Sequence, residues 1–267
     1  MNWRNFWAVI LIVAGILFLL DNLGILPGSA WGYIIPLVLV LLGVYLIQGS
    51  FGERPFETVA DFLPLEGAGA ARINFKHGAG SLNVFRGVET DKLLSGTFGG
   101  GVDKKIQRVG DRLEVGLQPS HQDWTRWMAP WNWWEARGML DWNVGLNPDI
   151  PLDLVFETGA SKSRIDLSAL KVTELTIRTG ASSTELVLPE KAGHTRARIS
   201  SGAASVEVRV PVGTAARIRG TMGLGSLNVD GQRFPRKDSV YESDGFAAAE
   251  NTVELDIEGG VGSVSVR

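Results

Sequence analysis

The sequence contains no cysteine and only three histidines among its 267 residues. The absence of cysteine excludes disulfides, zinc–thiolate sites, iron–sulfur clusters and cysteine nucleophiles. The histidines, His77, His121 and His194, are far apart, and none belongs to an HExxH-type spacing of metal ligands. Positive charge is also scarce, because 26 Lys and Arg stand against 29 Asp and Glu, which gives no basic field for nucleic acid. We therefore expect no metal site and no nucleic-acid partner.

The motifs of catalysis and cofactor binding are absent as well. The segment GASKS at residues 159–163 is superficially similar to a phosphate-binding loop but lacks the GxxxxGK[ST] pattern. The segment GGVGS at residues 259–263 is similar to calcium-binding nonapeptide repeats but lacks their aspartate ligand. Asp153, Glu157 and Asp166 are expected on the solvated side of strands. We therefore predict no catalytic residue, no cofactor and no enzymatic activity.

Two long hydrophobic runs occupy the first 48 residues. The first covers residues 6–20 and the second residues 31–47, with a short polar turn over residues 21–30 between them. At about 1.5 Å per residue, a helix as long as the second run spans roughly 25 Å, which is close to the minimum for crossing the hydrocarbon core. Tryptophan and tyrosine lie near the ends of the runs, where they favour the headgroup region. We predict a two-helix transmembrane module over residues 1–48 that contacts the lipid bilayer through residues 6–47.

The charges that flank the runs predict the orientation. Arg4 precedes the first run and Arg54 follows the second, while the turn contains Asp21 and no Lys or Arg. The positive-inside rule then places both ends in the cytoplasm. This makes a multi-pass protein of the cell membrane with a cytoplasmic C-terminal domain; the alternative is an extracytoplasmic domain. A signal peptide cleaved after residues 28–30 is a further alternative, but a second apolar run directly behind it is not expected of a secreted protein.

Glycine is abundant, at 33 residues, or about one in eight against a usual share near 7%. Beyond a linker over residues 49–69, it recurs in one pattern, as in LVFETGASKSRIDL from Leu154 and LTIRTGASSTELVL from Leu175. When the copies are aligned on one glycine, the three intervals between Gly159 and Gly223 are 21, 22 and 21 residues, which is typical of a repeat architecture. The six aligned glycines are Gly78, Gly159, Gly180, Gly202, Gly223 and Gly260.

Apolar and polar residues alternate on both sides of each aligned glycine. In the second copy the apolar residues are Leu154 and Phe156 before Gly159, and Ile165 and Leu167 after it. Alternation at a period of two predicts two half-buried strands per copy. The apolar residues lie an odd number of positions before the glycine and an even number after it. The alternation is therefore shifted by one residue at the glycine, and the backbone must accommodate this extra residue there. We expect a bulge, or a corner at which only glycine tolerates a positive φ.

We predict that residues 70–267 form an all-β domain, a β-solenoid (single-stranded β-helix) with repeats of about 21 residues. Its coils would stack through parallel ladders about 4.8 Å apart. An antiparallel sandwich of short strands is the competing fold. Two long intervals interrupt the repeat. The first contains further strands around Gly101 and Gly110 and then an insertion over residues 119–143, and the second is a polar excursion that returns to the solenoid at Thr252.

The insertion over residues 119–143 is rich in tryptophan. Tryptophan and arginine dominate binding hot spots and interfacial belts, so one interpretation is a contact surface for a partner protein or for the bilayer. The alternative is a loop that folds over the open end or the side of the solenoid and buries its own indoles. The six candidate contact residues are Trp124, Trp127, Trp131, Trp133, Trp134 and Trp142.

The two parts of the chain together resemble LiaF-like membrane proteins. The residues FWAVILIVAGILFLLDNLGILP at 6–27, followed by WGYIIPLVLVLLGVYLI at 31–47, are similar to the N-terminal membrane module of that group. The repeats, with phrases such as IPLDLVFETGASKSRIDLSALKVTELTIRTGASSTELVLP, look like its C-terminal toastrack (adhesin-like) domain. The resemblance covers residues 3–47 and 70–267 and implies a right-handed β-helical fold. The single helical hairpin, where some relatives have four helices, and the tryptophan-rich insertion depart from the family.

The resemblance implies a bacterial cell-envelope stress-response regulator that acts by protein–protein contacts. Such a protein restrains a membrane sensor histidine kinase of a two-component system. One alternative is a structural or adhesin-like envelope protein with an outward-facing solenoid. Another is a peripheral lipid sensor that uses the tryptophan-rich insertion. The expected partners are therefore the bilayer, a sensor kinase or another envelope protein, and a second copy of the chain.

Overall fold

The computed structural model describes residues 16, 19, 23, 24, 58–120 and 140–267. The chain divides into two compact units, Met1–Pro55 and Phe56–Arg267. In the described part of the first unit, Ile16 and Leu19 are helical. No helix among the described residues has the length and apolar character needed to cross a membrane. The rest of the membrane module predicted over residues 1–48 lies outside the described residues, as does most of the tryptophan-rich insertion.

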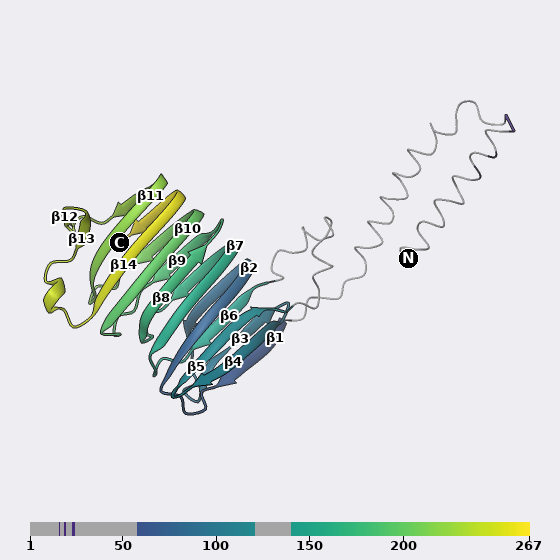
Figure 1. Cartoon of the computed structure of the whole chain (residues 1–267), viewed down its shortest axis with the longest axis horizontal. Coiled ribbons are helices and arrows are strands. Elements are labelled where there is room, and N and C mark those ends of the chain that lie inside the picture. The colour runs from purple at the N-terminus through teal and green to yellow at the C-terminus, as the bar shows by residue number, and fades with distance from the viewer. Residues whose placement is uncertain (1–15, 17–18, 20–22, 25–57, 121–139) are drawn as a thin grey trace. The chain divides into compact units, whose positions relative to one another are not determined.

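The described part of the second unit is all-β, apart from a short 3-10 helix near its C-terminal end (Figure 1). All of its strands belong to one hydrogen-bonded sheet. The strands are β1 (Thr58–Pro64), β2 (Ala70–Arg86), β3 (Lys92–Gly99), β4 (Val102–Val109), β5 (Arg112–Pro119), β6 (Trp142–Leu146), β7 (Leu152–Asp166), β8 (Val172–Thr179), β9 (Ser183–Val187), β10 (His194–Arg209), β11 (Ala215–Val229), β12 (Arg236–Lys237), β13 (Val240–Glu242) and β14 (Thr252–Val266), and the helix η3 spans Phe246–Ala248.

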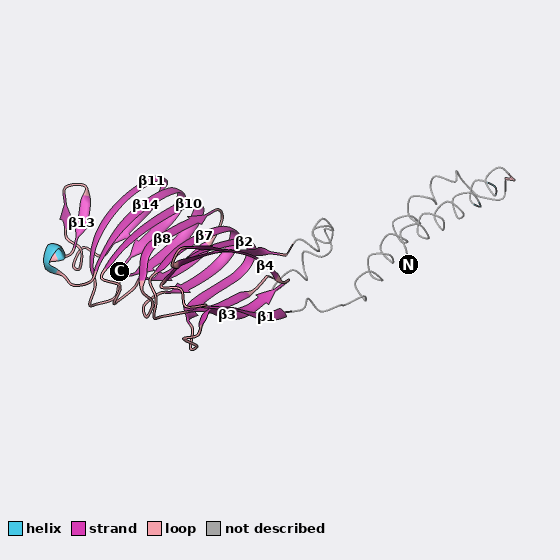
Figure 2. Ribbon diagram, turned by 60° about the horizontal axis from the view of Figure 1, so that its bottom comes forward, coloured by secondary structure: helices cyan, strands magenta, loops and turns pink. Residues whose placement is uncertain are grey.

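The centre of the sheet is a stack of parallel layers in the order β2, β7, β8 with β9, β10, β14 and β11 (Figures 1 and 2). Equivalent residues of the sequence copies lie opposite one another across this stack. Before the aligned glycine, Phe75 lies opposite Phe156, and Phe156 lies opposite Ile177. After the glycine, Val84 lies opposite Ile165. Each sequence copy is therefore one layer, and each layer covers the apolar side chains of its neighbours.

The layers bend at the aligned glycine. In β7, the buried residues are even-numbered up to Thr158 and odd-numbered from Ser161 to Ile165. The change of parity divides a layer into two arms, and the inner side of both arms is apolar. We call the residues before the bend the first arm and the residues after it the second arm.

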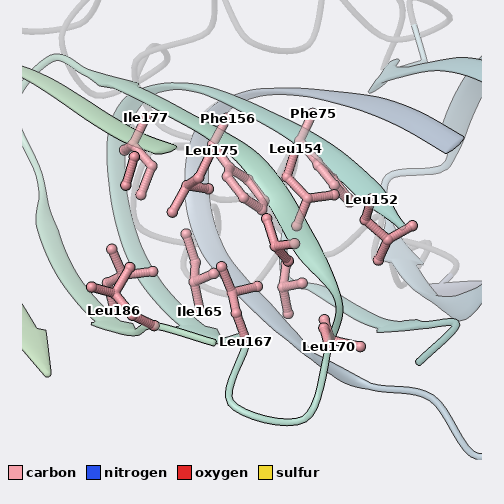
Figure 3. Close-up of a cluster of buried hydrophobic side chains, with 14 of the residues drawn as sticks. Phe75, Leu152, Leu154, Phe156, Ile165, Leu167, Leu170, Leu175, Ile177 and Leu186 are labelled. Atoms are coloured by element: carbon pink, nitrogen blue, oxygen red, sulfur yellow. The ribbon is translucent and has the colours of Figure 1, made fainter. Parts of the chain in front are cut away.

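The core lies between the first and the second arms. Figure 3 shows Phe156 and Leu175 of the first arms facing Ile165 and Leu167 of the second arms. The rings of Phe75 and Phe156 stack at 4.8 Å between centroids, with 14° between their planes. These five side chains are fully buried, and burial of one side chain of this size contributes about 1.5–3 kcal/mol. The core thus holds adjacent layers together.

Antiparallel strands close the end of the stack next to β2. Strands β5 and β6 still pair in parallel with the first and the second arm of β2. Beyond them, β4 is antiparallel to β5, β3 to β6, and β1 to β3. The linker predicted over residues 49–69 is therefore wrong for residues 58–64, which form β1, because the repeat pattern carries no signal for an antiparallel partner. The strands expected around Gly101 and Gly110 are present, and both glycines have positive φ, at 79° and 62°.

The last two sequence copies are stacked in the reverse of their sequence order. Strand β14 lies between β10 and β11 and pairs in parallel with both. The excursion over residues 230–251 carries the chain back to this place, and its hairpin β12–β13 pairs with β11 only at Arg217 and Ile218. The inward residue Ile257 of β14 lies opposite Gly220 of β11. The more apolar copy therefore occupies the interior layer, and the less apolar copy forms the end.

Candidate functional site

The aligned glycines form a column at the bends. A Cβ at Gly159 would overlap the carbonyl oxygen of Gly78, and one at Gly260 would lie 2.7 Å from the carbonyl oxygen of Gly202. At Gly180 the corresponding distance to the carbonyl of Gly159 would be 3.1 Å. None of the six aligned glycines has a positive φ, so the expected left-handed corner is wrong. The close approach of one layer's backbone to the next explains the choice of glycine at every aligned position except Gly78, where a Cβ would meet nothing within 4 Å.

Hydroxyl side chains cluster on the inner side of the bends. Thr158 Oγ1 donates to Thr179 Oγ1 at 3.0 Å, and Thr179 in turn donates to Ser182. The hydroxyl oxygens of Ser161 and Ser163 are 3.4 Å apart. These groups pair with one another because an unpaired buried hydroxyl costs about 1–3 kcal/mol. Within the described ranges, no histidine or carboxylate is hydrogen-bonded to this cluster, so it has no base that could activate a nucleophile.

The C-terminal end of the tryptophan-rich insertion is held at the bend of β2. Strand β5 ends beside the first arm of β2 and β6 begins beside its second arm. A ring nitrogen of His77, Nε2, lies 2.7 Å from the carbonyl oxygen of Leu140. The backbone N–H of Ser81 donates to Asp141 Oδ1 at 3.0 Å. The chain therefore re-enters the sheet at a point that is fixed to the bend of β2.

Burial controls the ionisation of His77. The carbonyl oxygen of Leu140 can only accept, so Nε2 carries the proton, and Nδ1 has no hydrogen-bond partner among the described residues. Burial lowers the pKa of His77 below the usual 6.5, although the hydrogen bond to Leu140 and the charge of Asp141 act in the opposite direction. His77 is thus a neutral, buried side chain at physiological pH. In the sequence His77 is an isolated histidine, and no local pattern indicates that it lies beside Leu140, at the C-terminal end of the insertion.

One of the six candidate contact residues is buried. Trp142 is 0% exposed, and its Nε1 donates to the carbonyl oxygen of Gly99 at 3.4 Å. Its ring meets the rings of Phe98 and His77 edge to face, at centroid distances of 5.2 and 5.3 Å. The expectation that Trp142 contacts a partner or the membrane is therefore wrong, because this residue opens β6 and faces the core. The other five, Trp124, Trp127, Trp131, Trp133 and Trp134, lie outside the described residues.

The outer faces of the layers carry charges of both signs in paired rows. Glu157 accepts from Arg178 at 3.1 Å and lies 3.7 Å from Lys76, so three consecutive layers are bridged. Arg164 donates to Glu185 at 3.0 Å, and this hydrogen bond lowers the pKa of the Glu185 carboxyl. Exposed pairs of this kind contribute little to stability, because water screens their attraction. They give the faces a mixed charge with no dominant sign.

An open groove of about 350 Å³ lies over β2, β4 and β5. Its lining mixes basic, acidic, amide and apolar groups, and the side-chain oxygen of Asn74 has no hydrogen-bond partner in the part of the chain that the structure describes. Among the described residues there is no group of three or more His, Asp or Glu that could hold a metal ion. The lining residues are Arg72, Asn74, Lys105, Ile106, Gln107, Glu114, Val115 and Gly116. These lining residues include no nucleophile placed beside a base, as a catalytic site would require.

Two family models match the chain. Residues 52–209 match the N-terminal domain of toast_rack, DUF2154, and residues 5–47 match the LiaI-LiaF-like transmembrane region. These matches confirm the resemblance that the sequence shows to LiaF-like proteins. Comparison with curated protein sequences gives no match.

One solved structure has the same fold as the β domain. It is the crystal structure of a proposed cell adhesion protein from Clostridium sporogenes ATCC 15579. The similarity has a TM-score of 0.69 at 22% sequence identity and covers 79% of this chain and 98% of that one. At this identity the likeness concerns the fold alone.

Proposed function

Because the chain belongs to the toast_rack family and carries a LiaI-LiaF-like transmembrane region, we propose that it is a membrane-anchored regulator of the cell-envelope stress response. The regulator acts by protein–protein contacts and restrains a membrane sensor histidine kinase until the envelope is damaged. It catalyses no reaction.

The observation that supports this proposal is the combination of a membrane region with a β domain whose polar groups serve its own structure. The buried hydroxyls pair with one another, and His77 is bonded to a backbone carbonyl. Surface acids and bases form pairs between layers, as Arg164 and Glu185 do. In the part of the chain that the structure describes, these groups are therefore occupied in holding the layers together, which leaves the surfaces for contact with other molecules.

The finer architecture is part of the same proposal. Residues 70–267 form a right-handed β-solenoid with coils of about 21 residues, which the in-register parallel layers support. Residues 1–48 form a hairpin of two transmembrane helices. The charges of Arg4 and Arg54, outside the two runs, support a cytoplasmic β domain in a multi-pass membrane protein.

Topology is the first test, because a kinase regulator of this type needs its β domain on the cytoplasmic side. Two reporters are fused after Arg267, one that is active only in the cytoplasm and one that is active only outside it. We expect activity from the cytoplasmic reporter alone. Deletion of residues 56–267 should then raise the stress response in unstressed cells. Activity from the external reporter, or an unchanged stress response after deletion, contradicts the proposal.

An outward-facing adhesin-like envelope protein is the second candidate, favoured by the fold shared with the clostridial protein. This function requires the β domain to lie outside the membrane. Protease added to intact cells or spheroplasts should then degrade residues 56–267, with a cytoplasmic protein as the control for lysis. Protection of the β domain rules this candidate out.

A further inference from the structure

Within the described ranges, strand β11 has a free backbone edge at the C-terminal end of the stack. The strand pairs with β14 on one side, and on the other side β13 covers only Arg217 and Ile218. Residues 220–229, GTMGLGSLNV, contain no charged residue and no proline. Natural sheets protect such edges with charges, proline or bulges, and an uncharged edge favours pairing with another strand. Over these ten residues the edge therefore has neither charge nor proline, and its only irregularity is the bend at Gly223.

The side chains next to this edge are more apolar than their equivalents elsewhere in the stack. The residue after the aligned glycine is alanine in the first four copies, as at Ala203, but Val261 in β14 and Leu224 in β11. Val261 is 53% exposed and Leu224 80% exposed. Inside the bend, Leu227 and Val229 are only partly buried. Val261 and Leu224 thus add exposed apolar surface to the last two layers, and the core is incompletely covered at this end.

The opposite end of the domain does not offer a matching edge. Strand β4 pairs only with β5 and carries four charged residues in eight, including Lys104 and Arg108. Lys104 Nζ donates to Asp61 Oδ1 at 2.7 Å and to the carbonyl oxygen of Phe62 at 3.2 Å, which occupies part of the β1 edge. Head-to-tail stacking of copies would need two complementary edges. In an arrangement that joins the C-terminal ends of two copies, the free edge of β11 in one copy pairs with the same edge in the other.

We propose that β11 pairs antiparallel with β11 of a second copy of this chain, about a two-fold axis that passes through the bend near Leu224. A two-fold rotation about the bisector of a bent strand exchanges its two arms and reverses the stacking direction. The first arm at Arg219–Gly223 of one copy then lies against residues 224–228 of the other, with Gly220 opposite Leu227, so that inward residues face inward residues. The axis passes between Gly223 and Leu224, and the two Leu224 residues lie on either side of it. Leu227 of each copy becomes covered, so one core continues across both domains.

Cysteine cross-linking of the full chain in detergent tests this pairing, because the natural sequence has no cysteine. The variant Leu224→Cys places one thiol per chain beside the proposed axis. The control Val88→Cys places it at a residue that is 95% exposed, in the connection between β2 and β3. With a short thiol cross-linker we expect the Leu224→Cys chain to give about ten times more covalent dimer than the control, since the two thiols lie on either side of the axis in neighbouring positions of the antiparallel pair, where side chains are about 5–8 Å apart. Equal yields from the two variants overturn the proposal.

Sedimentation of the full chain provides an independent measurement. In Leu224→Lys, two like charges lie close together on either side of the axis, so we expect the dimer to weaken at least about tenfold, which corresponds to ~1.4 kcal/mol. Val88→Lys is the control and should leave the dimer unchanged. The urea midpoint at high dilution should be the same for both variants, because both sites are exposed. A dimer that survives Leu224→Lys, a monomeric parent chain, or an assembly larger than a dimer each contradicts the two-fold arrangement.

Discussion

At the scale of single residues, six glycines that look equivalent in the sequence have different surroundings. A Cβ at Gly159 would overlap the carbonyl oxygen of Gly78, while a Cβ at Gly78 would have nothing within 4 Å. Gly180 and Gly202 lie between these extremes. A Cβ at these positions would be 3.1 and 3.2 Å from the carbonyl oxygen of the preceding aligned glycine. Each glycine makes room for the backbone of the layer before it, and Gly78 has no aligned glycine before it. The need for glycine is therefore set by a neighbour and not by the local dihedral angle.

This difference predicts unequal costs for the same substitution. Gly159→Ala should lower the free energy of unfolding by about 1–3 kcal/mol, because the added methyl group forces the backbones of two layers apart. Gly78→Ala should change it by less than about 0.5 kcal/mol, since the methyl group enters open space. Urea unfolding of the two variants beside the parent chain measures the difference. Similar losses at both positions would contradict the close-approach explanation.

His77 predicts a dependence of stability on pH. Burial lowers its pKa in the folded chain below 6.5, so the unfolded chain binds more protons in the window between the folded pKa and 6.5. Stability should therefore fall as the pH is lowered through this window and should not change further on this account below the folded pKa. In His77→Gln, whose amide can still donate to the Leu140 carbonyl, this part of the loss should disappear.

The measurement is the difference between urea midpoints at about pH 7.5 and about pH 5, where histidine linkage operates. His194→Gln is the matched control, because His194 is exposed and bonds only to Thr252. The pH-dependent loss should be smaller in His77→Gln than in the parent chain and in the control. If all three chains lose stability equally, His77 is not the group that titrates.

At the scale of elements, the arrangement of β14 and β11 follows from how apolar each is. The inward residues of β14, such as Leu255, Ile257 and Val264, are at most 2% exposed. The residue of β11 that lies opposite Val264, Leu227, is only partly buried. An interior layer is covered on both sides, so a large apolar residue buries more surface there, and contributes more to stability, than in an end layer. The copy with the stronger hydrophobic residues therefore occupies the interior, although it comes last in the sequence.

Truncation of one side chain in each layer tests this account. Leu255→Ala should cost about 2–5 kcal/mol, as expected for a fully buried leucine. Leu227→Ala should cost about 1 kcal/mol, because only part of its surface leaves water on folding. Both substitutions are made in the Leu224→Lys background, so that pairing with a second copy does not bury Leu227. Equal losses would mean that β11 is covered as fully as β14.

The sequence predicts the layers of the stack better than it predicts the ends. Strands β7 to β10 follow the repeat, and the predicted inward residues Leu154, Phe156, Ile165 and Leu167 are all buried. At the β2 end, β1 was expected to be linker, because antiparallel pairing with β3 leaves no periodic mark in its sequence. At the other end, the aligned glycines indicate that a sixth layer exists but not where it is inserted. Both failures concern contacts between segments that are distant in the chain.

At the scale of the whole molecule, the β domain is one continuous structure. Its buried core extends from Leu63 in β1 to Val266 in β14 without interruption. The antiparallel strands at one end belong to the same core as the parallel layers. Although repeat proteins can lose cooperativity along their length, a core shared in this way favours a single unfolding transition.

Calorimetry of the unit Phe56–Arg267 tests this cooperativity. We expect one transition, with an unfolding enthalpy of about 0.7 kcal/mol per residue near 60 °C. The calorimetric and van't Hoff enthalpies should agree for a two-state domain. Two separate transitions would show that the antiparallel end and the parallel layers unfold independently.

The sequence by itself determined the all-β repeat layers and the resemblance to LiaF-like proteins, because period-two alternation and the spacing of Gly159, Gly180 and Gly202 are local properties of the chain. Only the tertiary structure decided that β14 enters between β10 and β11, that His77 and Trp142 meet at the C-terminal end of the insertion, and that β11 keeps a free edge within the described ranges. These features depend on which strands compete for the same neighbours and on how much apolar surface each pairing buries. Such a competition is settled by the complete set of contacts, and no short segment of the sequence contains it.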